Sequence, residues 1–219
     1  MTIRQTPTQR RQALALRAAE HLSAVHPSLE PIISRVGPHR LKVTRDPFLT
    51  LVGSIIQQQI SMSAAASIQR RLTEACPGGL VTPAAIQRLG SARLRKAGLS
   101  NQKAGYLVDL ARHADTGRLS RRTLSRLDDE EIIVRATEIR GIGRWTAEML
   151  LIFCLERPDV WPIDDLGLRK AVARFTGREL DKKGIVALAE PWRPFRSYAS
   201  WYLWRSLEGP KMPGIELRS

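Results

Sequence analysis

The stretch RGIGRWTAEM, residues 140–149, places two glycines two positions apart, directly before an apolar run, LLIFCL. Glycine weakens a helix or strand and reaches backbone conformations that other residues avoid, so Gly141 and Gly143 predict a tight turn. Apolar residues follow helical spacing on both sides of it, in LDDEEIIVRATEI and in the apolar run. The stretch therefore predicts two helices joined by a glycine turn, a helix-hairpin-helix over residues 129–155.

The predicted turn has the properties of an anion site. Backbone N–H groups of the turn and of the next helix's first residues, Arg144 to Thr146, have no acceptor within that helix, and the positive end of the helix dipole reinforces them. Such donors suit a DNA phosphate, with Arg140 and Arg144 as neighbouring positive charges. A P-loop is excluded because GxxxxGK[ST] is absent and no strand precedes the turn. A purely structural turn between packed helices remains the alternative.

The whole chain is strongly basic, with 35 Lys and Arg against 21 Asp and Glu and a formal net charge of +14. Clustered basic residues bind a phosphate backbone by releasing its counterions, so this balance favours a nucleic acid as partner. The alternative is an arginine-rich proteome in which every protein is basic. No apolar run is long enough to span a bilayer and no secretory signal is seen, so the sequence predicts a cytoplasmic protein without a membrane partner.

Cysteine usage limits the cofactors. The chain has two cysteines, Cys76 and Cys154, and no CxxC motif. A four-cysteine zinc site and an all-cysteine iron-sulfur cluster are thereby excluded, since each needs four thiolates. Cys154 lies within the apolar run, where a buried and inert thiol is expected.

Helical periodicity recurs along the chain and no segment alternates as a strand does. We therefore expect an all-α fold of roughly ten to twelve short helices. Residues 1–45 predict a basic helical arm packed on the core, residues 46–208 the core itself, and residues 209–219 a C-terminal tail. Asp46 and Pro47 predict the start of a buried helix that ends at the polar triplet QQQ.

A pair of acidic residues follows the hairpin. Asp164 and Asp165 are adjacent within ERPDVWPIDDLGLRKAVARF, and we take 158–175 as a candidate catalytic segment. One carboxylate can cap the next helix by accepting its N–H bonds. Both serving only as caps would be redundant, although paired acids at helix starts are common, so the capping interpretation stays open at this point.

Three motifs in matching order carry a family resemblance: GIGRWTA, PIDDLGLRKAVARF and PWRPFRSYASWYLW. Together they resemble the helix-hairpin-helix DNA glycosylases with a Gly/Pro-rich loop and a single aspartate, and within them the bacterial 3-methyladenine DNA glycosylase II group. The resemblance covers about residues 46–208. It implies an all-α fold of two helical subdomains with the active-site cleft between them.

The resemblance also assigns roles to residues. Asp165 matches the family's catalytic aspartate, and Asp164 falls on the neighbouring position, where we expect a cap or a support. Gly141 and Gly143, with the N–H groups that follow, match a phosphate-gripping hairpin. Its backbone carbonyls commonly hold a monovalent cation in this family, Na⁺ or K⁺, so a structural cation there is expected and no other cofactor is required.

Trp145 bears on whether the protein also cleaves the DNA strand. Relatives that also cleave the DNA strand carry a nucleophilic lysine there, which forms a Schiff base, and tryptophan cannot do so. The resemblance therefore implies a monofunctional glycosylase. Trp204 matches a second aromatic of the base pocket, with Tyr198 before it, and we read the other aromatics of this region as core.

Further positions complete the expected site. Met149 and Leu166 occupy places that hold pocket tyrosines in some relatives, so we expect a wider, more apolar pocket that admits etheno-adenine. Gln58 and Gln59 lie on a turn that in relatives enters the minor groove. Ile60 is a substitute for the apolar wedge of those relatives. The alternative is that the glutamines only form the polar end of a helix and have no role in DNA binding.

The combined prediction is a monomeric DNA glycosylase acting on double-stranded DNA in the cytoplasm, associated with the nucleoid. It is expected to flip out alkylated purines such as 3-methyladenine and to hydrolyse the N-glycosidic bond in base excision repair. Three alternatives remain: a glycosylase for oxidised or mismatched bases, a DNA-binding hairpin module without chemistry, and a basic structural protein of the nucleoid. The missing cluster cysteines and lysine argue against the endonuclease III and 8-oxoguanine types.

Overall fold

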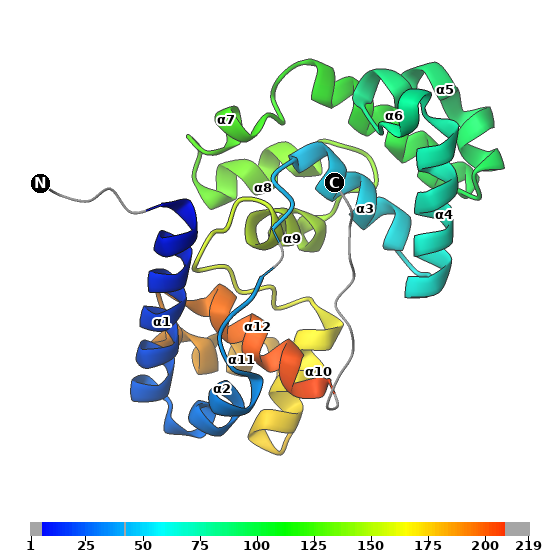
Figure 1. Ribbon diagram of the computed structural model, residues 1–219. Helices are drawn as coiled ribbons and strands as arrows, with labels where there is room; N and C mark the ends of the chain where they lie inside the picture. Colours follow the sequence, from blue (N-terminus) through cyan, green and yellow to red (C-terminus); the bar gives the residue numbers. More distant parts are fainter. Residues whose placement is uncertain (1–5, 42, 209–219) are drawn as a thin grey trace, which may run out of the picture. The chain divides into compact units, whose positions relative to one another are not determined.

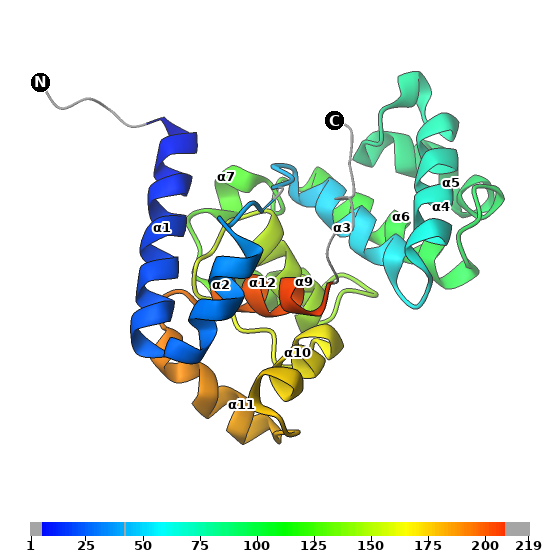
Figure 2. The same ribbon diagram turned by 60° about the horizontal axis from the view of Figure 1, so that its bottom comes forward.

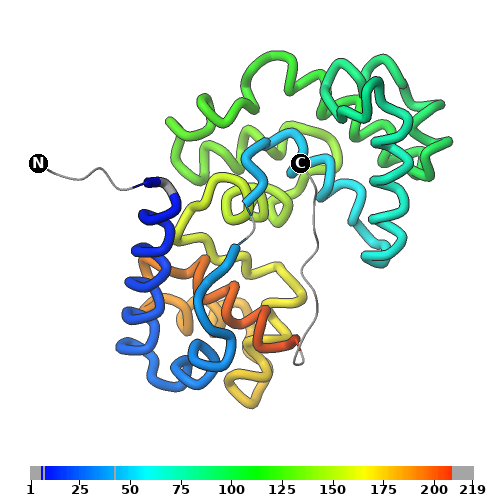
Figure 3. The backbone as a smooth tube through the Cα atoms, in the orientation of Figure 1, coloured from blue at the N-terminus to red at the C-terminus, as the bar shows by residue number. Residues whose placement is uncertain are grey.

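The computed structural model describes residues 6–41 and 43–208, and every regular element in these ranges is a helix (Figure 1). The predicted all-α class is therefore confirmed. Contacts divide the chain into two units: unit 1 is Met1–Leu41 with Arg157–Ser219, and unit 2 is Lys42–Glu156. The chain runs through the first part of unit 1, then through all of unit 2, and returns to unit 1 (Figure 3). No described helix is long and apolar enough to cross a membrane.

Unit 1 is built from helices of both of its chain segments. They are α1 (Pro7–Val25), the 3₁₀ turn η1 (Pro27–Leu29), α2 (Glu30–Val36), α10 (Leu166–Thr176), α11 (Lys182–Ala189), the 3₁₀ turn η3 (Glu190–Trp192) and α12 (Arg196–Leu207). Helix α2 lies against α12, as the views of Figures 1 and 2 both show.

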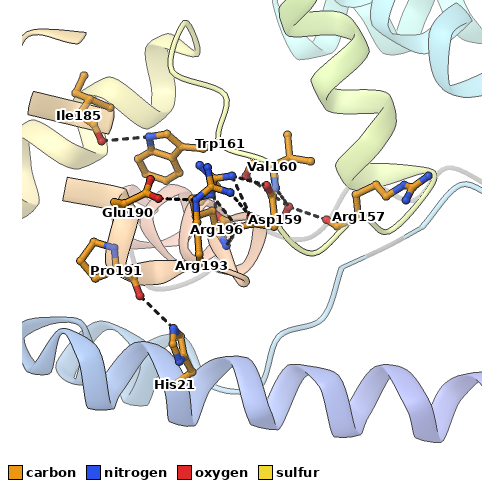
Figure 4. Close-up of polar contacts among 12 residues, drawn as sticks. His21, Arg157, Asp159, Val160, Trp161, Ile185, Glu190, Pro191, Arg193 and Arg196 are labelled. Carbon is orange, nitrogen blue, oxygen red and sulfur yellow. Dashed lines mark hydrogen bonds and ion pairs between the residues drawn. The ribbon is translucent and has the colours of Figure 1, made fainter. Parts of the chain in front are cut away.

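The core of unit 1 joins its two chain segments. Leu22 and Leu29, both without exposed surface, belong to one buried cluster with Trp192 and Tyr202. His21 Nε2 also lies 3.1 Å from the Pro191 carbonyl oxygen (Figure 4). The sequence predicted an arm beside a core of residues 46–208, whereas the contacts make the described part of residues 1–41 an integral half of unit 1. The predicted tail, 209–219, lies outside the described residues.

Unit 2 contains the remaining helices. They are α3 (Pro47–Gln57), α4 (Met62–Ala75), the 3₁₀ turn η2 (Pro77–Gly79), α5 (Pro83–Lys96), α6 (Asn101–Asp115), α7 (Arg121–Leu124), α8 (Asp129–Thr137) and α9 (Arg144–Phe153). Helix α3 begins as predicted, since Asp46 Oδ1 accepts hydrogen bonds from the Phe48 and Leu49 N–H groups at 2.8 and 3.2 Å. Its apolar face packs on α6 and α9.

A partly buried polar network fixes the segment that enters unit 1 ahead of α10. Asp159 accepts hydrogen bonds from the Arg196 guanidinium at 2.8 and 3.0 Å and from Arg193 at 3.0 Å (Figure 4). The Ser197 hydroxyl donates to the Arg157 carbonyl at 2.7 Å and accepts from the Val160 N–H at 2.9 Å. These paired charges and hydrogen bonds hold the segment to the start of α12, just before the two aspartates.

The aromatic part of unit 1 includes a buried histidine. The ring of His39 lies 4.4 Å from that of Tyr198 and 4.6 Å from that of Trp201, between centroids. Burial lowers the pKa of His39 from its ordinary 6.5 to about 4, because the charged form loses its hydration.

This depressed pKa predicts a pH dependence of stability. Below pH 6.5 the unfolded chain binds a proton at His39 that the folded chain excludes until about pH 4. The free energy of unfolding should therefore fall between these two pH values, by up to about 3 kcal/mol. The matched control is His39→Phe, which keeps an aromatic ring and cannot titrate. Urea unfolding between pH 7 and 4 should show a steeper loss in the wild type, and equal slopes would contradict the prediction.

Candidate nucleic-acid interface and active site

The hairpin turn joins α8 to α9 and depends on one of its two glycines. Gly141 has a φ of +82°, and a Cβ on it would lie 2.1 Å from the Tyr106 ring of α6. Backbone conformation and close approach therefore both require glycine there. Gly143 is extended, with φ −93° and ψ 176°, and a Cβ on it would meet nothing within 4 Å. The conformational role predicted for both glycines is thus confirmed for Gly141 and wrong for Gly143.

Gly143 instead occupies the N-cap of α9. It makes no side-chain cap hydrogen bond there, so no capping oxygen of its own occupies the first N–H groups of the helix. Thr146 is 3% exposed, and its backbone N–H, rather than its side chain, belongs to this N-terminus. The first turn of α9 therefore has the geometry of an anion-binding helix start.

The two hairpin arginines are each paired with carboxylates. Arg144 donates to both Glu130 oxygens at 2.8 Å, and its Nε lies 3.3 Å from Glu148 Oε1. These partners raise the pKa of Arg144, and the hydrogen bond from Arg144 lowers the pKa of Glu130. Arg140 Nε lies 3.6 Å from Asp109 Oδ2, which also accepts the Arg140 N–H at 3.0 Å. Part of their charge is thus neutralised within unit 2, and their role toward phosphate stays a prediction.

The turn after α3 lies against the hairpin. Gln58 Nε2 donates to the Gly141 carbonyl at 2.8 Å. Lys103 Nζ donates to the Ile56 carbonyl at 2.8 Å and to the Gln58 carbonyl at 2.6 Å. Gln59 has a φ of +55°, a left-handed conformation that is uncommon outside glycine, and Ile60 is 37% exposed. The structure therefore joins two of the predicted DNA-contacting turns.

The first turns of α9 carry the predicted aromatic. Trp145 is 37% exposed, whereas Met149, one helical turn later, is 7% exposed. Residues four apart lie on the same side of a helix. Trp145 therefore offers an accessible ring face and Met149 lies mainly in the core of unit 2.

In unit 1 the two adjacent aspartates have separate partners. Asp165 is the N-cap of α10: its Oδ1 accepts the Leu168 N–H at 2.5 Å and also the Trp204 indole N–H at 2.8 Å. Asp164 forms an ion pair with Lys182, with 2.5 Å between Oδ1 and Nζ. Of the two roles expected for Asp164, the cap is wrong, because the carboxylate that accepts an open N–H group of α10 belongs to Asp165. A supporting role of Asp164 stays a prediction.

The other residues predicted to line the base pocket differ in their exposure to solvent. Leu166 is 70% exposed at the start of α10, whereas Tyr198 is 8% exposed and its ring contacts those of His39 and Phe195. Trp204 is partly buried and hydrogen-bonds Asp165. The structure therefore brings together Asp165, Trp204 and Leu166, and places Tyr198 in the aromatic core; its pocket role stays a prediction.

Three residues of α6 that contact these turns were not predicted from the sequence: Lys103, Tyr106 and Asp109. Their regular spacing of three along a helix is the signal that they share one face. The hydrogen bond between Trp204 and Asp165 had no sequence signal.

The expected cation site can be compared with the hairpin carbonyls. Gly141 O already accepts a hydrogen bond from Gln58, and Ile139 O accepts the Ile142 N–H at 3.1 Å. The Gly141 carbonyl thus already has one donor, and a cation at the hairpin stays a prediction. Among the described residues, no group of three His, Cys, Asp or Glu could hold a metal ion.

The asymmetry of the two glycines predicts unequal effects of the same substitution. Gly141→Ala should lower the free energy of unfolding by about 2 kcal/mol or more, because its methyl overlaps the Tyr106 ring and the left-handed backbone is strained. Gly143→Ala is the matched control and should change it by less than about 1 kcal/mol. Urea unfolding of both variants gives the comparison, and equal losses would contradict this account of the turn.

Comparison with known proteins supports the family resemblance. The family model described as 'HhH-GPD superfamily base excision DNA repair protein' matches residues 52–194 of this chain. DNA-3-methyladenine glycosylase 1 of Schizosaccharomyces pombe is 34% identical over 198 residues, which are 87% of this chain and 86% of the relative. The putative DNA-3-methyladenine glycosylase YfjP of Bacillus subtilis is 37% identical over 164 residues, 70% of this chain and 56% of that protein.

A solved structure agrees with these matches. The S. pombe 3-methyladenine DNA glycosylase Mag1, determined in complex with abasic DNA, superposes with a TM-score of 0.78 at 34% identity. The match covers 87% of this chain and 96% of that one. Fold, hairpin and sequence agree over most of the chain, and the protein therefore belongs to the HhH-GPD superfamily of base excision DNA repair proteins.

Proposed function

We propose that this protein is a monofunctional DNA glycosylase that removes alkylated purines from double-stranded DNA in base excision repair. The observation that carries the proposal is the Asp165 carboxylate, held by the Leu168 and Trp204 N–H groups; the family resemblance of the sequence assigns this residue the catalytic role. The names of the relatives support the reaction class. The protein would act as a monomer in the cytoplasm, on the DNA of the nucleoid.

The proposed reaction begins with extrusion of the damaged nucleotide. A base within a duplex hides its glycosidic bond, and flipping it out costs a few kcal/mol, less for a weakly paired lesion. Alkylation at a ring nitrogen makes a purine cationic, which favours stacking on an aromatic face. Trp145, which is 37% exposed, would supply such a face in unit 2, and Trp204 is the candidate in unit 1. Exposed Leu166 would make the pocket apolar and wide enough for etheno-adenine.

The bond between the sugar C1′ and the base nitrogen then breaks, and its electron pair leaves with the base. A cationic purine becomes neutral in this step, which makes it a good leaving group. Positive charge develops on the sugar, and the Asp165 carboxylate stabilises it. Water adds to C1′ and gives its proton to that carboxylate. The products are the free base and an abasic site.

The hairpin would hold the DNA during this reaction. The N–H groups of Gly143 and of the first turn of α9, including that of Thr146, are suited to a phosphate, with the half-exposed Arg144 beside them. The turn with Gln58, Gln59 and Ile60 would occupy the minor groove. Because Trp145 stands where strand-cleaving relatives have lysine, no Schiff base forms and the strand stays intact.

The substitution Asp165→Asn tests the catalytic assignment. Asparagine caps helices as well as aspartate does and also accepts N–H bonds, so the fold should be retained. Base release should fall by at least about a hundredfold, because the charge that stabilises the sugar cation is lost. The assay uses duplexes with one 3-methyladenine, etheno-adenine, 8-oxoguanine or mismatched base, and alkali to cleave at abasic sites. DNA affinity, measured by fluorescence anisotropy, serves as the control and should be unchanged.

Two results would contradict this assignment separately. Retained base release in Asp165→Asn would remove Asp165 from the chemistry. Strand breaks by the wild type before alkali treatment would contradict the monofunctional assignment. If the protein released only the oxidised or mismatched bases, its substrates would be those bases and not alkylated purines.

The substitution Trp204→Phe tests whether this indole orients Asp165. Phenylalanine keeps a ring but loses the N–H that binds Oδ1. A hydrogen bond to a charged group is worth about 1.5 to 3 kcal/mol, so kcat should fall by about tenfold or more, in addition to the rise in KM that a smaller stacking ring gives. Trp145→Phe is the matched control, because it reduces the stacking surface without touching Asp165, and should mainly raise KM. A rise in KM with unchanged kcat in Trp204→Phe would contradict the orienting role.

A further inference from the structure

Two turns of unit 2 that are far apart in the sequence meet through a single hydrogen bond. The first, residues 58–61, follows α3, and we call it the glutamine turn. The second, residues 138–143, is the hairpin turn. Gln58 Nε2 of the glutamine turn donates to the Gly141 carbonyl of the hairpin turn at 2.8 Å, across 83 positions of sequence, in a part-buried contact.

Helix α6 contacts both turns along one face. Lys103 Nζ binds the Ile56 and Gln58 carbonyls at the end of α3. The Tyr106 ring lies against Gly141, and Asp109 Oδ2 accepts the Arg140 N–H at 3.0 Å. These α6 residues follow one another at intervals of three, which places them in a row along the helix. We call them the α6 row.

Each turn contains one residue in the left-handed region, Gln59 with φ +55° and Gly141 with φ +82°. A left-handed glutamine is uncommon and persists where neighbouring contacts hold it. Lys103 supplies such contacts on the α3 side of Gln59, and its positive charge also favours the carbonyl end of that helix. The shape of each turn is therefore held by the α6 row.

We propose that Gln58 is a positioning residue that locks the glutamine turn to the hairpin turn, so that both are preformed on the α6 row as one rigid DNA-binding surface. The proposal rests on the proposed function, since it takes both turns to contact DNA. Ordering a mobile turn on binding costs affinity, and a preformed surface avoids that cost. Loss of the Gln58 donor should loosen the hairpin turn before DNA is bound and should weaken DNA binding.

The substitution Gln58→Met tests this, because methionine has a similar length and no N–H donor. Hydrogen exchange of the amides in residues 139–144, measured without DNA, should become about tenfold faster, as expected when one hydrogen bond of ordinary strength is lost. Gln58→Glu should accelerate it at least as much, since an ionised carboxylate only accepts hydrogen bonds. The control is Gln87→Met, which removes an exposed glutamine hydrogen bond to Asp115 elsewhere in unit 2.

The functional readout separates binding from chemistry. In Gln58→Met the Kd for an abasic-site duplex should rise about tenfold, whereas in the control Gln87→Met it should match the wild type. Unchanged exchange in residues 139–144 would overturn the proposal. Exchange that accelerates throughout unit 2 would also overturn it, because Gln58 would then only stabilise the fold. A fall in the single-turnover rate with unchanged Kd would place Gln58 in the chemistry instead.

These measurements remain informative if the proposed function fails. A wild type that releases no base from any duplex would refute the glycosylase reaction. The exchange rates and the Kd for DNA would still test the coupling of the two turns, because neither depends on base release.

Discussion

The contact between the Gly141 backbone and the Tyr106 ring is the constraint on which the architecture of unit 2 depends. Only a residue without a Cβ can lie there with φ +82°. In that position its carbonyl reaches Gln58, and the chain then continues extended through Gly143 into α9. The end of the turn fixes where α9 starts and therefore the direction in which Trp145 points. The absence of a Cβ at Gly141 thus determines how closely the hairpin packs against α3 and α6.

Local signals made much of the fold predictable. The start of α3 at Asp46 and Pro47 and the turn before α9 could be predicted from adjacent residues. The all-α class could be predicted from helical periodicity alone. The place of the N-terminal helices was not predictable in this way. Whether Leu22 is buried depends on the shape complementarity of Trp192 and Tyr202, which are distant in sequence. No local pattern contains that information.

The candidate site divides along the same line. The acidic pair was visible in the sequence. Either aspartate could have been the cap, because the capping residue is the one directly before the first residue of α10, and the sequence did not show where that helix begins. The indole that binds Asp165 lies 39 positions away, and the glutamine that binds Gly141 lies 83 positions away. Such partners become apparent only when the chain is folded. Motifs therefore identified reacting groups better than the groups that orient them.

The division of unit 1 between two chain segments has a consequence for biosynthesis. The ribosome translates α1 and α2 before unit 2, whereas the buried partners of Leu22 and Leu29, among them Trp192 and Tyr202, are translated after it. All of unit 2 emerges in the meantime and holds its contacts within one continuous segment. Domains fold as units as they emerge. Unit 2 can thus be completed while the apolar surfaces of α1 and α2 still lack their partners, and the Trp204 hydrogen bond to Asp165 forms only after unit 2 has been translated.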